Sequence, residues 1–298
     1  MKGIVLAGGS GSRLYPITKA VSKQLLPIYD KPMVYFPVSV LMLAGIRDIL
    51  IITTPEDSDA FKRLLGDGSS FGVRFEYAVQ PRPEGLAQAF IIGEEFLDGN
   101  DVCLVLGDNV FHGGRFSEYL RTGITNANGT NGLVPSATVF GYYVTDPRRY
   151  GVAEIGSSGE VLSIEEKPEV PKSNYAIPGI YFYPSDVVNK AKQITPSVRG
   201  ELEITSLNQI YLSEHRLSIV TLPRGFTWLD TGTFDSLSDA SNYVETIEKR
   251  TGLQIACLEE IGFNQGWLTI DKLKQSLGTL GKNSYRDYIE DLIERGGS

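Results

Sequence analysis

A cluster of glycines followed by an arginine lies directly after the first apolar run of the chain. The run covers residues 4–7, and the motif Gly8-Gly9-Ser10-Gly11-Ser12-Arg13 follows it. A short apolar run that ends in glycines is typical of a strand in a parallel sheet, and anionic ligands bind at the carboxyl ends of such strands. Successive backbone N–H groups can hold a phosphate. The cluster therefore predicts a phosphate-binding loop.

Two familiar phosphate motifs do not fit this cluster. The dinucleotide fingerprint requires a glycine where Leu14 stands, and the Walker loop requires Lys-Ser or Lys-Thr where Ser12-Arg13 stands. A glycine cluster can also be only a tight turn. Local charge favours the phosphate site, because residues 1–31 contain five cationic residues and one acidic residue, a net charge of +4 in a chain of formal charge −8.

Two aspartates follow other apolar runs. Asp108 comes shortly after residues 102–106, and Asp230 follows Trp228-Leu229. Carboxylates at strand ends can hold Mg²⁺, which prefers oxygen ligands. Either aspartate could instead cap a helix or stabilise a turn. From the residues alone, both interpretations stay open.

Composition excludes several classes of protein. With 42% hydrophobic and 21% charged residues, the 298-residue chain has the composition of a folded globular protein. The net charge of −8 and a pI near 5.0 disfavour binding to nucleic acid or to a membrane. The two cysteines and two histidines show neither a zinc-ligand spacing nor a disulfide framework. We find no signal peptide or membrane-spanning segment in the sequence, and we expect a cytoplasmic protein.

Strand-like runs alternate with helical segments in the first half of the chain. We expect strands at residues 4–7, 49–53, 102–106, 137–140 and 180–183, and helices at 33–44, 61–65 and 86–96. The alternation predicts βαβ units. Short alternating segments after residue 137 predict β-hairpins, and the stretch 123–135, rich in Asn and Gly, predicts an exposed loop. From Phe234 the pattern is helical; we expect that helix to end at Gly252, and Thr269 and Ser284 to cap two more.

These patterns predict an α/β fold with a central, mostly parallel sheet flanked by helices. We expect an α/β core at residues 1–233, which includes a β-rich part at about 137–220. Residues 234–298 are expected to form a C-terminal helical region. No internal repeat or long polar linker divides the chain.

Several blocks of the sequence resemble the sugar-1-phosphate nucleotidyltransferase family, specifically its glucose-1-phosphate thymidylyltransferases. The first block is the motif of residues 6–14 together with Ser22-Lys23-Gln24-Leu25-Leu26-Pro27. Further blocks follow in the family's order: Leu65-Gly66-Asp67-Gly68-Ser69, Gly85-Leu86-Ala87-Gln88-Ala89-Phe90, Leu106-Gly107-Asp108-Asn109, Glu165-Glu166-Lys167-Pro168, Arg199-Gly200-Glu201-Leu202-Glu203-Ile204-Thr205 and Trp228-Leu229-Asp230-Thr231-Gly232-Thr233. Matches that span most of the chain are more specific than one loop.

The resemblance implies a Rossmann-like nucleotidyltransferase fold with a β-rich sugar-binding insertion and C-terminal helices for assembly or regulation. It implies transfer of a thymidylyl group from dTTP to α-D-glucose 1-phosphate, which gives dTDP-glucose and pyrophosphate as the first step of dTDP-L-rhamnose biosynthesis. A related enzyme that uses UTP or another sugar phosphate would have similar phosphate machinery and stays an alternative. A catalytically silent paralogue is disfavoured because the loop and metal residues are present.

The resemblance also assigns roles to individual residues. It assigns catalysis to Arg13, Lys23, Asp108 and Asp230, and a Mg²⁺ ion to the two aspartates. It assigns nucleotide binding to Gly8, Gly11, Ser12, Arg13, Lys23, Gln80, Gly85 and Asp108, and sugar-phosphate binding to Asn109, Gly151, Glu166, Lys167 and Arg199. We expect the Gln80 amide to offer both a donor and an acceptor to thymine. Without the resemblance, Lys23 would be a solvated lysine and Glu166-Lys167 a surface charge pair.

Assembly and regulation are further implications of the resemblance. It implies a homotetramer that the end product, dTDP-rhamnose, inhibits at a site away from catalysis. Three residues depart from the usual pattern: Ser12 stands where threonine is frequent, His112 where tyrosine is usual, and Phe234 where histidine often stands. Ser12 keeps a hydroxyl group, so these changes bear on regulation and assembly more than on chemistry.

Overall fold

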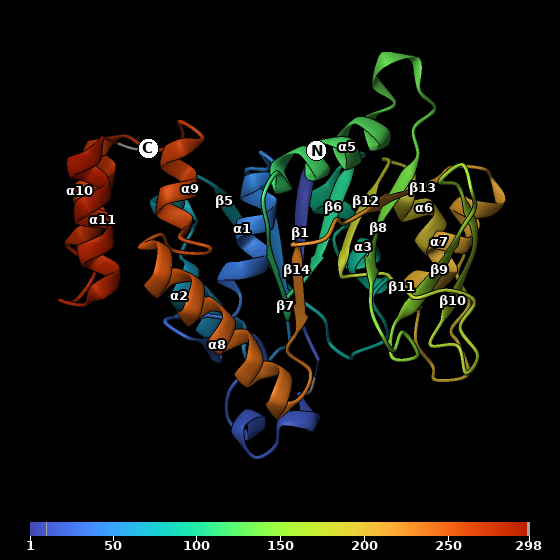
Figure 1. Cartoon of the computed structure of the whole chain (residues 1–298), viewed down its shortest axis with the longest axis horizontal. Helices are drawn as coiled ribbons and strands as arrows, with labels where there is room; N and C mark the ends of the chain where they lie inside the picture. Colours follow the sequence, from blue (N-terminus) through green and yellow to red (C-terminus); the bar gives the residue numbers. More distant parts are fainter. Residues whose placement is uncertain (10, 297–298) are drawn as a thin grey trace.

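The computed structural model describes residues 1–9 and 11–296, so Ser10 of the glycine cluster lies outside the described residues. Within them, the main sheet has ten strands and helices on both faces (Figure 1). Its order is β10 (Val161–Glu166), β9 (Gly151–Ile155), β11 (Tyr175–Ala176), β8 (Ala137–Tyr143), β12 (Ile180–Tyr183), β6 (Val102–Leu106), β1 (Lys2–Ala7), β4 (Asp48–Thr53) and β5 (Arg74–Val79), and β13 (Leu217–Thr221) pairs with β8. The expected α/β fold is confirmed.

Four parallel strands, β6, β1, β4 and β5, form one end of this sheet. Gly3 of β1 lies between Ile49 of β4 and Cys103 of β6, and β5 pairs with the other side of β4. Most residues of β1, β4 and β6 are buried, which explains their continuous apolar runs. Because the strands are parallel, the residues that follow β1 and β6 meet at one edge of the sheet.

Helices cover the two faces. On one face, α1 (Tyr35–Leu43) and α2 (Ser58–Leu65) contribute to the apolar cluster that contains Val5 of β1. On the other, α3 (Gln88–Ile92) and α7 (Ile204–Ser213) contribute to the cluster that contains Ile4. The helix expected at 86–96 is two short helices, α3 and α4 (Glu94–Leu97), because Gly93 interrupts it. No helix of the described residues is long and apolar enough to cross a membrane.

The β-rich part extends the same sheet. Strand β12 runs antiparallel to both β6 and β8, so it joins the parallel strands to the strands beyond it (Figure 1). Strands β9 and β10 form the expected hairpin, with its turn at residues 156–159. The hairpin and the parallel strands therefore belong to one continuous sheet.

The C-terminal region consists of helices that begin directly after the last strand (Figure 1). They are α8 (Phe234–Thr251), α9 (Leu258–Asn264), α10 (Ile270–Leu277) and α11 (Ser284–Arg295). The expected end at Gly252 and the expected cap at Thr269 are confirmed. The expected cap at Ser284 is wrong: Asn283, one residue earlier, has an extended backbone and its side chain accepts a hydrogen bond from the Arg286 amide.

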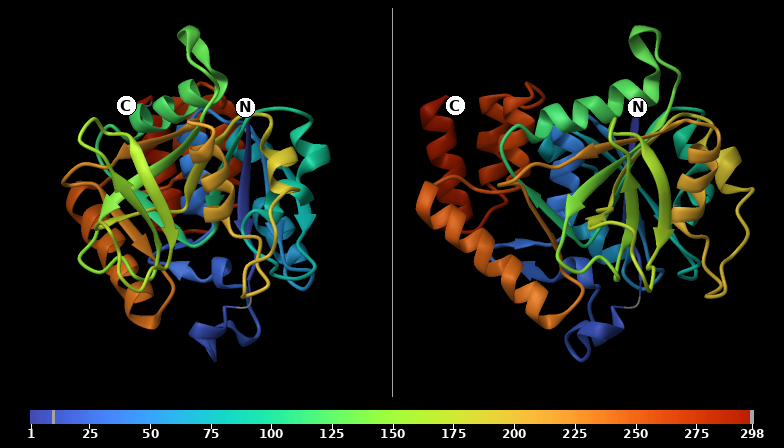
Figure 2. Two further views of the ribbon diagram at one scale, coloured as in Figure 1. Left: turned by 90° about the vertical axis from the view of Figure 1, so that its right-hand side faces the viewer. Right: turned by 45° about the vertical axis from the view of Figure 1, so that its right-hand side comes forward.

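The loop expected at 123–135 is wrong over its first half. Helix α5 (Phe116–Asn128) includes the first residues of this stretch, and the segment after the helix projects from the body of the molecule (Figure 2). The buried side of α5 is formed by Phe116, Leu120, Gly123 and Ala127, at helical spacing. Packing of this face outweighs the loop-like composition, and a Cβ on Gly123 would lie 2.5 Å from Cδ2 of the buried Phe182 ring.

Gly123→Ala should destabilise the protein although alanine favours helices by about 1 kcal/mol over glycine. The added methyl group would overpack the core against Phe182, which costs about 1–3 kcal/mol. We expect the free energy of unfolding in urea to fall by about 1 kcal/mol. In a Phe182→Leu background the same change should be neutral or stabilising. An equal loss in both backgrounds would contradict the steric explanation.

Candidate active site

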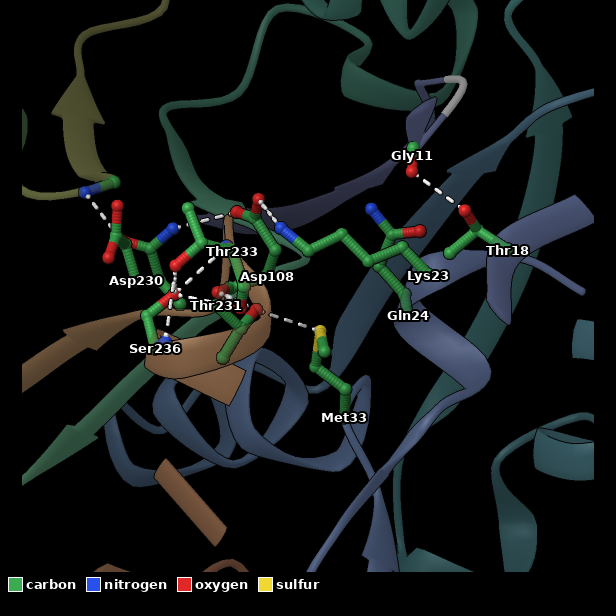
Figure 3. A network of polar contacts seen from close by, with 12 residues as sticks. Gly11, Thr18, Lys23, Gln24, Met33, Asp108, Asp230, Thr231, Thr233 and Ser236 are labelled. Carbon is green, nitrogen blue, oxygen red and sulfur yellow. Dashed lines mark hydrogen bonds and ion pairs between the residues drawn. The ribbon is translucent and has the colours of Figure 1, made fainter. Parts of the chain in front are cut away.

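The described glycines of the cluster, Gly8, Gly9 and Gly11, lie at the carboxyl end of β1. Gly11 has a φ of 57°, in the left-handed region that favours glycine, and its carbonyl accepts a hydrogen bond from Thr18 Oγ1 at 2.7 Å (Figure 3). The carbonyl of Gly8 accepts one from Gln24 Nε2 at 3.1 Å. These bonds hold the loop at the rim of a cavity of about 470 Å³, which Gly8, Gly11 and Ser12 line.

Two cations of the amino-terminal segment line the same cavity. Arg13 is exposed, and no ion pair within the described part of the chain engages it. Lys23 is buried, and its Nζ lies 2.6 Å from Oδ2 of Asp108 (Figure 3). Lys23 is therefore not a solvated surface lysine. Its charge is directed into the cavity beside a carboxylate.

Strand pairing brings the two predicted metal ligands to this cavity. Strand β7 (Asn109–His112) pairs antiparallel with β14 (Thr227–Asp230), so that Asp230 lies opposite Asn109. The Thr231 hydroxyl also donates a hydrogen bond to the Asp108 carbonyl at 2.9 Å. Both Asp108 and Asp230 line the cavity, and their side chains are 33% and 25% exposed, so ligands can reach both.

The Asn109 amide connects three elements beneath the cavity. Its Oδ1 accepts hydrogen bonds from the Gly179 amide at 3.2 Å and from Trp228 Nε1 at 2.6 Å, and its Nδ2 donates to Asp108 Oδ1 at 2.8 Å. Asn109 lines the cavity as expected of a sugar-phosphate ligand. Because its oxygen already has two donors, the amide has one N–H left for a ligand.

The other predicted sugar-phosphate residues divide between two neighbouring cavities. Gly151 of β9 and Glu166 of β10 lie opposite each other in the hairpin and line the main cavity together with Lys167, whose Nζ is 3.2 Å from Glu166 Oε1. Arg199 does not line that cavity. It lies 2.8 Å from Glu203 and lines an adjoining cavity, to which Glu166 and Lys167 also contribute.

Several lining residues were not identified from the sequence. Arg149 Nη2 lies 3.5 Å from Asp230 Oδ2, and the Tyr150 hydroxyl donates a hydrogen bond to the same oxygen at 3.3 Å. Burial and the charge of Asp230 raise the pKa of Tyr150, which favours the protonated donor. Thr205 and Asn208 of α7 also line the cavity. The only hint in the sequence was the Arg148-Arg149 pair before Gly151, because residues inside a helix carry no local signal of a cavity.

The predicted nucleobase residues line a cavity of about 210 Å³ that shares Gly8 and Asp108 with the main one. Gln80 and Gly85 both contribute to it. Gln80 Nε2 donates to Gln88 Oε1 at 2.7 Å and to the Gly85 carbonyl at 3.3 Å, so both of its N–H groups are used within the protein. The oxygen of this amide is therefore the atom that remains available to a base.

Comparison with known proteins agrees with this arrangement. The sequence matches the nucleotidyl transferase family over residues 2–247. It is 56% identical over 295 residues to the glucose-1-phosphate thymidylyltransferase of Neisseria meningitidis, which covers 99% of this chain and 100% of that protein. The chain belongs to the glucose-1-phosphate thymidylyltransferase family. Another family member, from Mycobacterium tuberculosis, is 51% identical over 295 residues and covers 99% and 100% of the two chains.

Solved structures share the fold. A Bacillus anthracis protein, provisionally named as a glucose-1-phosphate thymidylyltransferase and crystallised with sucrose, has a TM-score of 0.74 and 42% identity over 82% of this chain and 94% of that one. A UDP-glucose pyrophosphorylase bound to UDP-glucose has a TM-score of 0.69 but 24% identity over 83% and 98% of the chains, and it shows the fold alone. The family inferred from the sequence blocks is confirmed.

The role of Asn109 predicts a specific loss of stability. Asn109→Leu should leave the Gly179 and Trp228 N–H groups buried without an acceptor, at about 1–3 kcal/mol for each group. We therefore expect urea denaturation to show a loss of roughly 2–4 kcal/mol in the free energy of unfolding. Combining it with Trp228→Phe should cost less than the sum of the two single changes, because one unpaired donor is then gone. Strict additivity would count against the shared acceptor.

Proposed function

We propose that this protein transfers a thymidylyl group from dTTP to α-D-glucose 1-phosphate. A phosphate oxygen of the sugar phosphate attacks the α-phosphorus of dTTP. The bond from that phosphorus to the oxygen bridging to the β-phosphate breaks, and pyrophosphate leaves with the bonding electron pair. The products are dTDP-glucose and pyrophosphate. Because one phosphoanhydride replaces another, the reaction is expected to be reversible.

One observation carries this proposal: a single cavity is lined both by the glycine loop with its cations and by residues of the β9–β10 hairpin. Two anionic substrates can meet there only if their repulsion is neutralised and their orientation is fixed, which is most of what this displacement requires. We assign Gly8, Gly11 and Ser12 to the triphosphate. Glu166 and Lys167 belong to the sugar phosphate.

The cations would act at different stages of the reaction. Arg13, exposed beside the loop, pairs with the outer phosphates and the departing pyrophosphate. Lys23 is buried at the cavity floor and offsets the charge that develops at the α-phosphate. Its 2.6 Å contact with Asp108 keeps the ammonium oriented before substrate binds. Arg199 would have to leave Glu203 to reach a ligand in the main cavity.

The residues present fit a magnesium ion. Asp108 and Asp230 supply hard oxygen donors on one cavity, and Mg²⁺ is commonly bound by one or two carboxylates, with substrate phosphates and water completing its shell. No group of three or more His, Cys, Asp or Glu side chains within residues 1–9 and 11–296 forms a larger metal cluster. When bound, the ion would supply electrostatic stabilisation of the phosphate oxygens.

A related reaction with UTP is the alternative. The relatives named glucose-1-phosphate thymidylyltransferase are 51% and 56% identical to this chain, whereas the UDP-glucose pyrophosphorylase is 24% identical. This difference supports dTTP as the substrate. The deciding experiment measures pyrophosphate release from a matrix of nucleoside triphosphates and sugar 1-phosphates. Highest kcat/KM with dTTP and glucose 1-phosphate is expected, and no release with that pair would overturn the proposal.

Asp230→Asn should reduce turnover while the fold survives. The change keeps the side-chain shape but removes one of the two carboxylate charges assigned to Mg²⁺, and loss of such a contact typically lowers kcat by about a hundredfold. We expect dTTP affinity to change little and the Mg²⁺ concentration for half-maximal activity to rise. Asp239→Asn, at an exposed position of α8, is the matched control. Unchanged turnover and Mg²⁺ dependence would remove Asp230 from the metal site.

We further propose a homotetramer that dTDP-rhamnose inhibits outside the catalytic cavity. A second cavity of about 460 Å³ supports an effector site, because among the described residues it shares no lining side chain with the catalytic one. It is lined by His112, Arg115 and Arg121, and two guanidinium groups suit a pyrophosphate. His112 contacts the Tyr243 hydroxyl at 2.8 Å, and burial lowers its pKa, so a neutral imidazole faces this cavity.

Arg115→Met should weaken inhibition by dTDP-rhamnose by about tenfold, the usual effect of removing one charge-assisted hydrogen bond. Inhibition of the unmodified protein should not be competitive with dTTP. Arg63→Met, on α2, serves as the control because Arg63 is exposed and does not line this cavity. Light scattering should give the mass of four chains. Purely competitive inhibition, or a monomer, would contradict this arrangement.

A further inference from the structure

Three side chains form a hydrogen-bonded chain beside the nucleobase cavity. Gln80 Nε2 donates to Gln88 Oε1 at 2.7 Å, and Gln88 Nε2 donates to Glu84 Oε2 at 2.7 Å. Gln80 is buried at the cavity wall, Gln88 is half-buried at the start of α3, and Glu84 is exposed. The chain therefore runs from solvent to the base site.

The chemistry of its outer end fixes the direction of every bond. An ionised carboxylate can only accept, so the Gln88 NH₂ group must face Glu84. The oxygen of Gln88 then faces Gln80, so Gln80 must donate to it from its NH₂ group. The Gly85 carbonyl supports the same orientation only weakly, because its contact with Gln80 Nε2 is long for a hydrogen bond, at 3.3 Å. An amide that could otherwise flip has one favoured orientation.

The backbone that carries this chain is held firmly. Glu84 accepts a hydrogen bond from the Leu202 amide at 2.7 Å through its carbonyl, and the Ala87 amide donates to the Leu202 carbonyl at 3.1 Å. Gly85 between them has a φ of 107°, and a Cβ there would stand 2.4 Å from the Leu202 carbonyl oxygen. Only glycine permits this close approach, which keeps Glu84 and Gln88 in register with Gln80.

The orientation leaves an acceptor for the ligand. Both N–H groups of the Gln80 amide are used, so Oε1 is the atom left to bind a ligand. No hydrogen bond from the described residues reaches that oxygen. Oε1 lies beside Gly8, 2.6 Å from where a Cβ on that residue would stand, and Gly8 lines the same cavity. A base that enters must bring an N–H group to this point.

We propose that Gln88, held by Glu84, is a positioning residue that makes the Gln80 amide an acceptor and so selects bases with an imide N–H. This inference rests on the proposed function. Thymine and uracil carry that N–H, whereas cytosine has an unprotonated ring nitrogen at the equivalent position. Cytosine would place two acceptors against each other, which costs affinity because neither lone pair finds a donor. This hydrogen-bonded chain therefore favours binding of dTTP over dCTP but does not distinguish dTTP from UTP.

The test measures binding of dTTP and of dCTP to the full chain by calorimetry, with Mg²⁺ and without sugar phosphate. Gln88→Met keeps the length of the side chain but neither donates to Glu84 nor accepts well from Gln80. It should lower the ratio of the two dissociation constants by about tenfold, because the Gln80 amide can then offer its NH₂ group to cytosine. Gln193→Met, at an exposed position after α6 (Val187–Ala191), should leave the ratio unchanged.

An exchanged variant distinguishes orientation from packing. The double change Glu84→Gln with Gln88→Glu exchanges the amide and the carboxylate. The carboxylate at position 88 again accepts a hydrogen bond from the Gln80 NH₂ group, so the ratio of the two dissociation constants should return to within about twofold of that of the unmodified protein. If packing alone mattered, this variant would show no such recovery. Should Gln88→Met fail to fold, Glu84→Gln at the exposed end replaces it, with a smaller loss of the ratio expected.

Different results would overturn the proposed function and the proposed role of Gln88. An unmodified protein that makes no dTDP-glucose from dTTP and glucose 1-phosphate overturns the proposed function. An active protein that binds dTTP and dCTP equally, or one whose preference survives Gln88→Met within about twofold, overturns this inference and leaves the proposed function intact.

Discussion

The fold depends on one buried amide, that of Asn109. Its oxygen receives N–H groups from Gly179, before β12, and from Trp228 of β14, while its NH₂ group supports Asp108. Buried donors of this kind are costly to leave unpaired, so these elements stabilise one another's positions. Because Asp108 precedes this amide and Asp230 lies opposite it in the ladder, the interior of the protein sets where the two carboxylates stand.

Local charge around this point differs from the charge of the whole chain. The formal charge is −8, yet Lys23 lies beside Asp108 and Arg149 beside Asp230. Each carboxylate therefore has a cation within 4 Å, and Arg13 adds a further cation at the cavity. An acidic protein can accept two anionic substrates because the field inside a cavity is governed by its nearest groups.

The sequence predicted the parts that depend on local patterns. Continuous apolar runs identified β1, β4 and β6, and the residues after them identified the loop and Asp108. Prediction from the sequence failed where a residue far along the chain determines the local structure or its hydrogen bonds. Gly123 lies inside a helix although glycine disfavours helices, because the α5 face packs on the core and Phe182 leaves no room for a Cβ there. Asn109 is largely occupied by donors far along the chain. The donors of Gln80 could not be counted without knowing that Gln88 and Gly85 face it.

Strand β12 limits how this molecule can move. It pairs with β6 on one side and β8 on the other, so the half that carries the glycine loop and the half that carries the hairpin share one ladder. A hinge between them would break backbone hydrogen bonds along the middle of the sheet. Closure around substrates is therefore confined to connections outside the strands, such as residues 81–83 and 197–201. The sheet itself stays rigid while substrates bind, and the movement takes place in these connections.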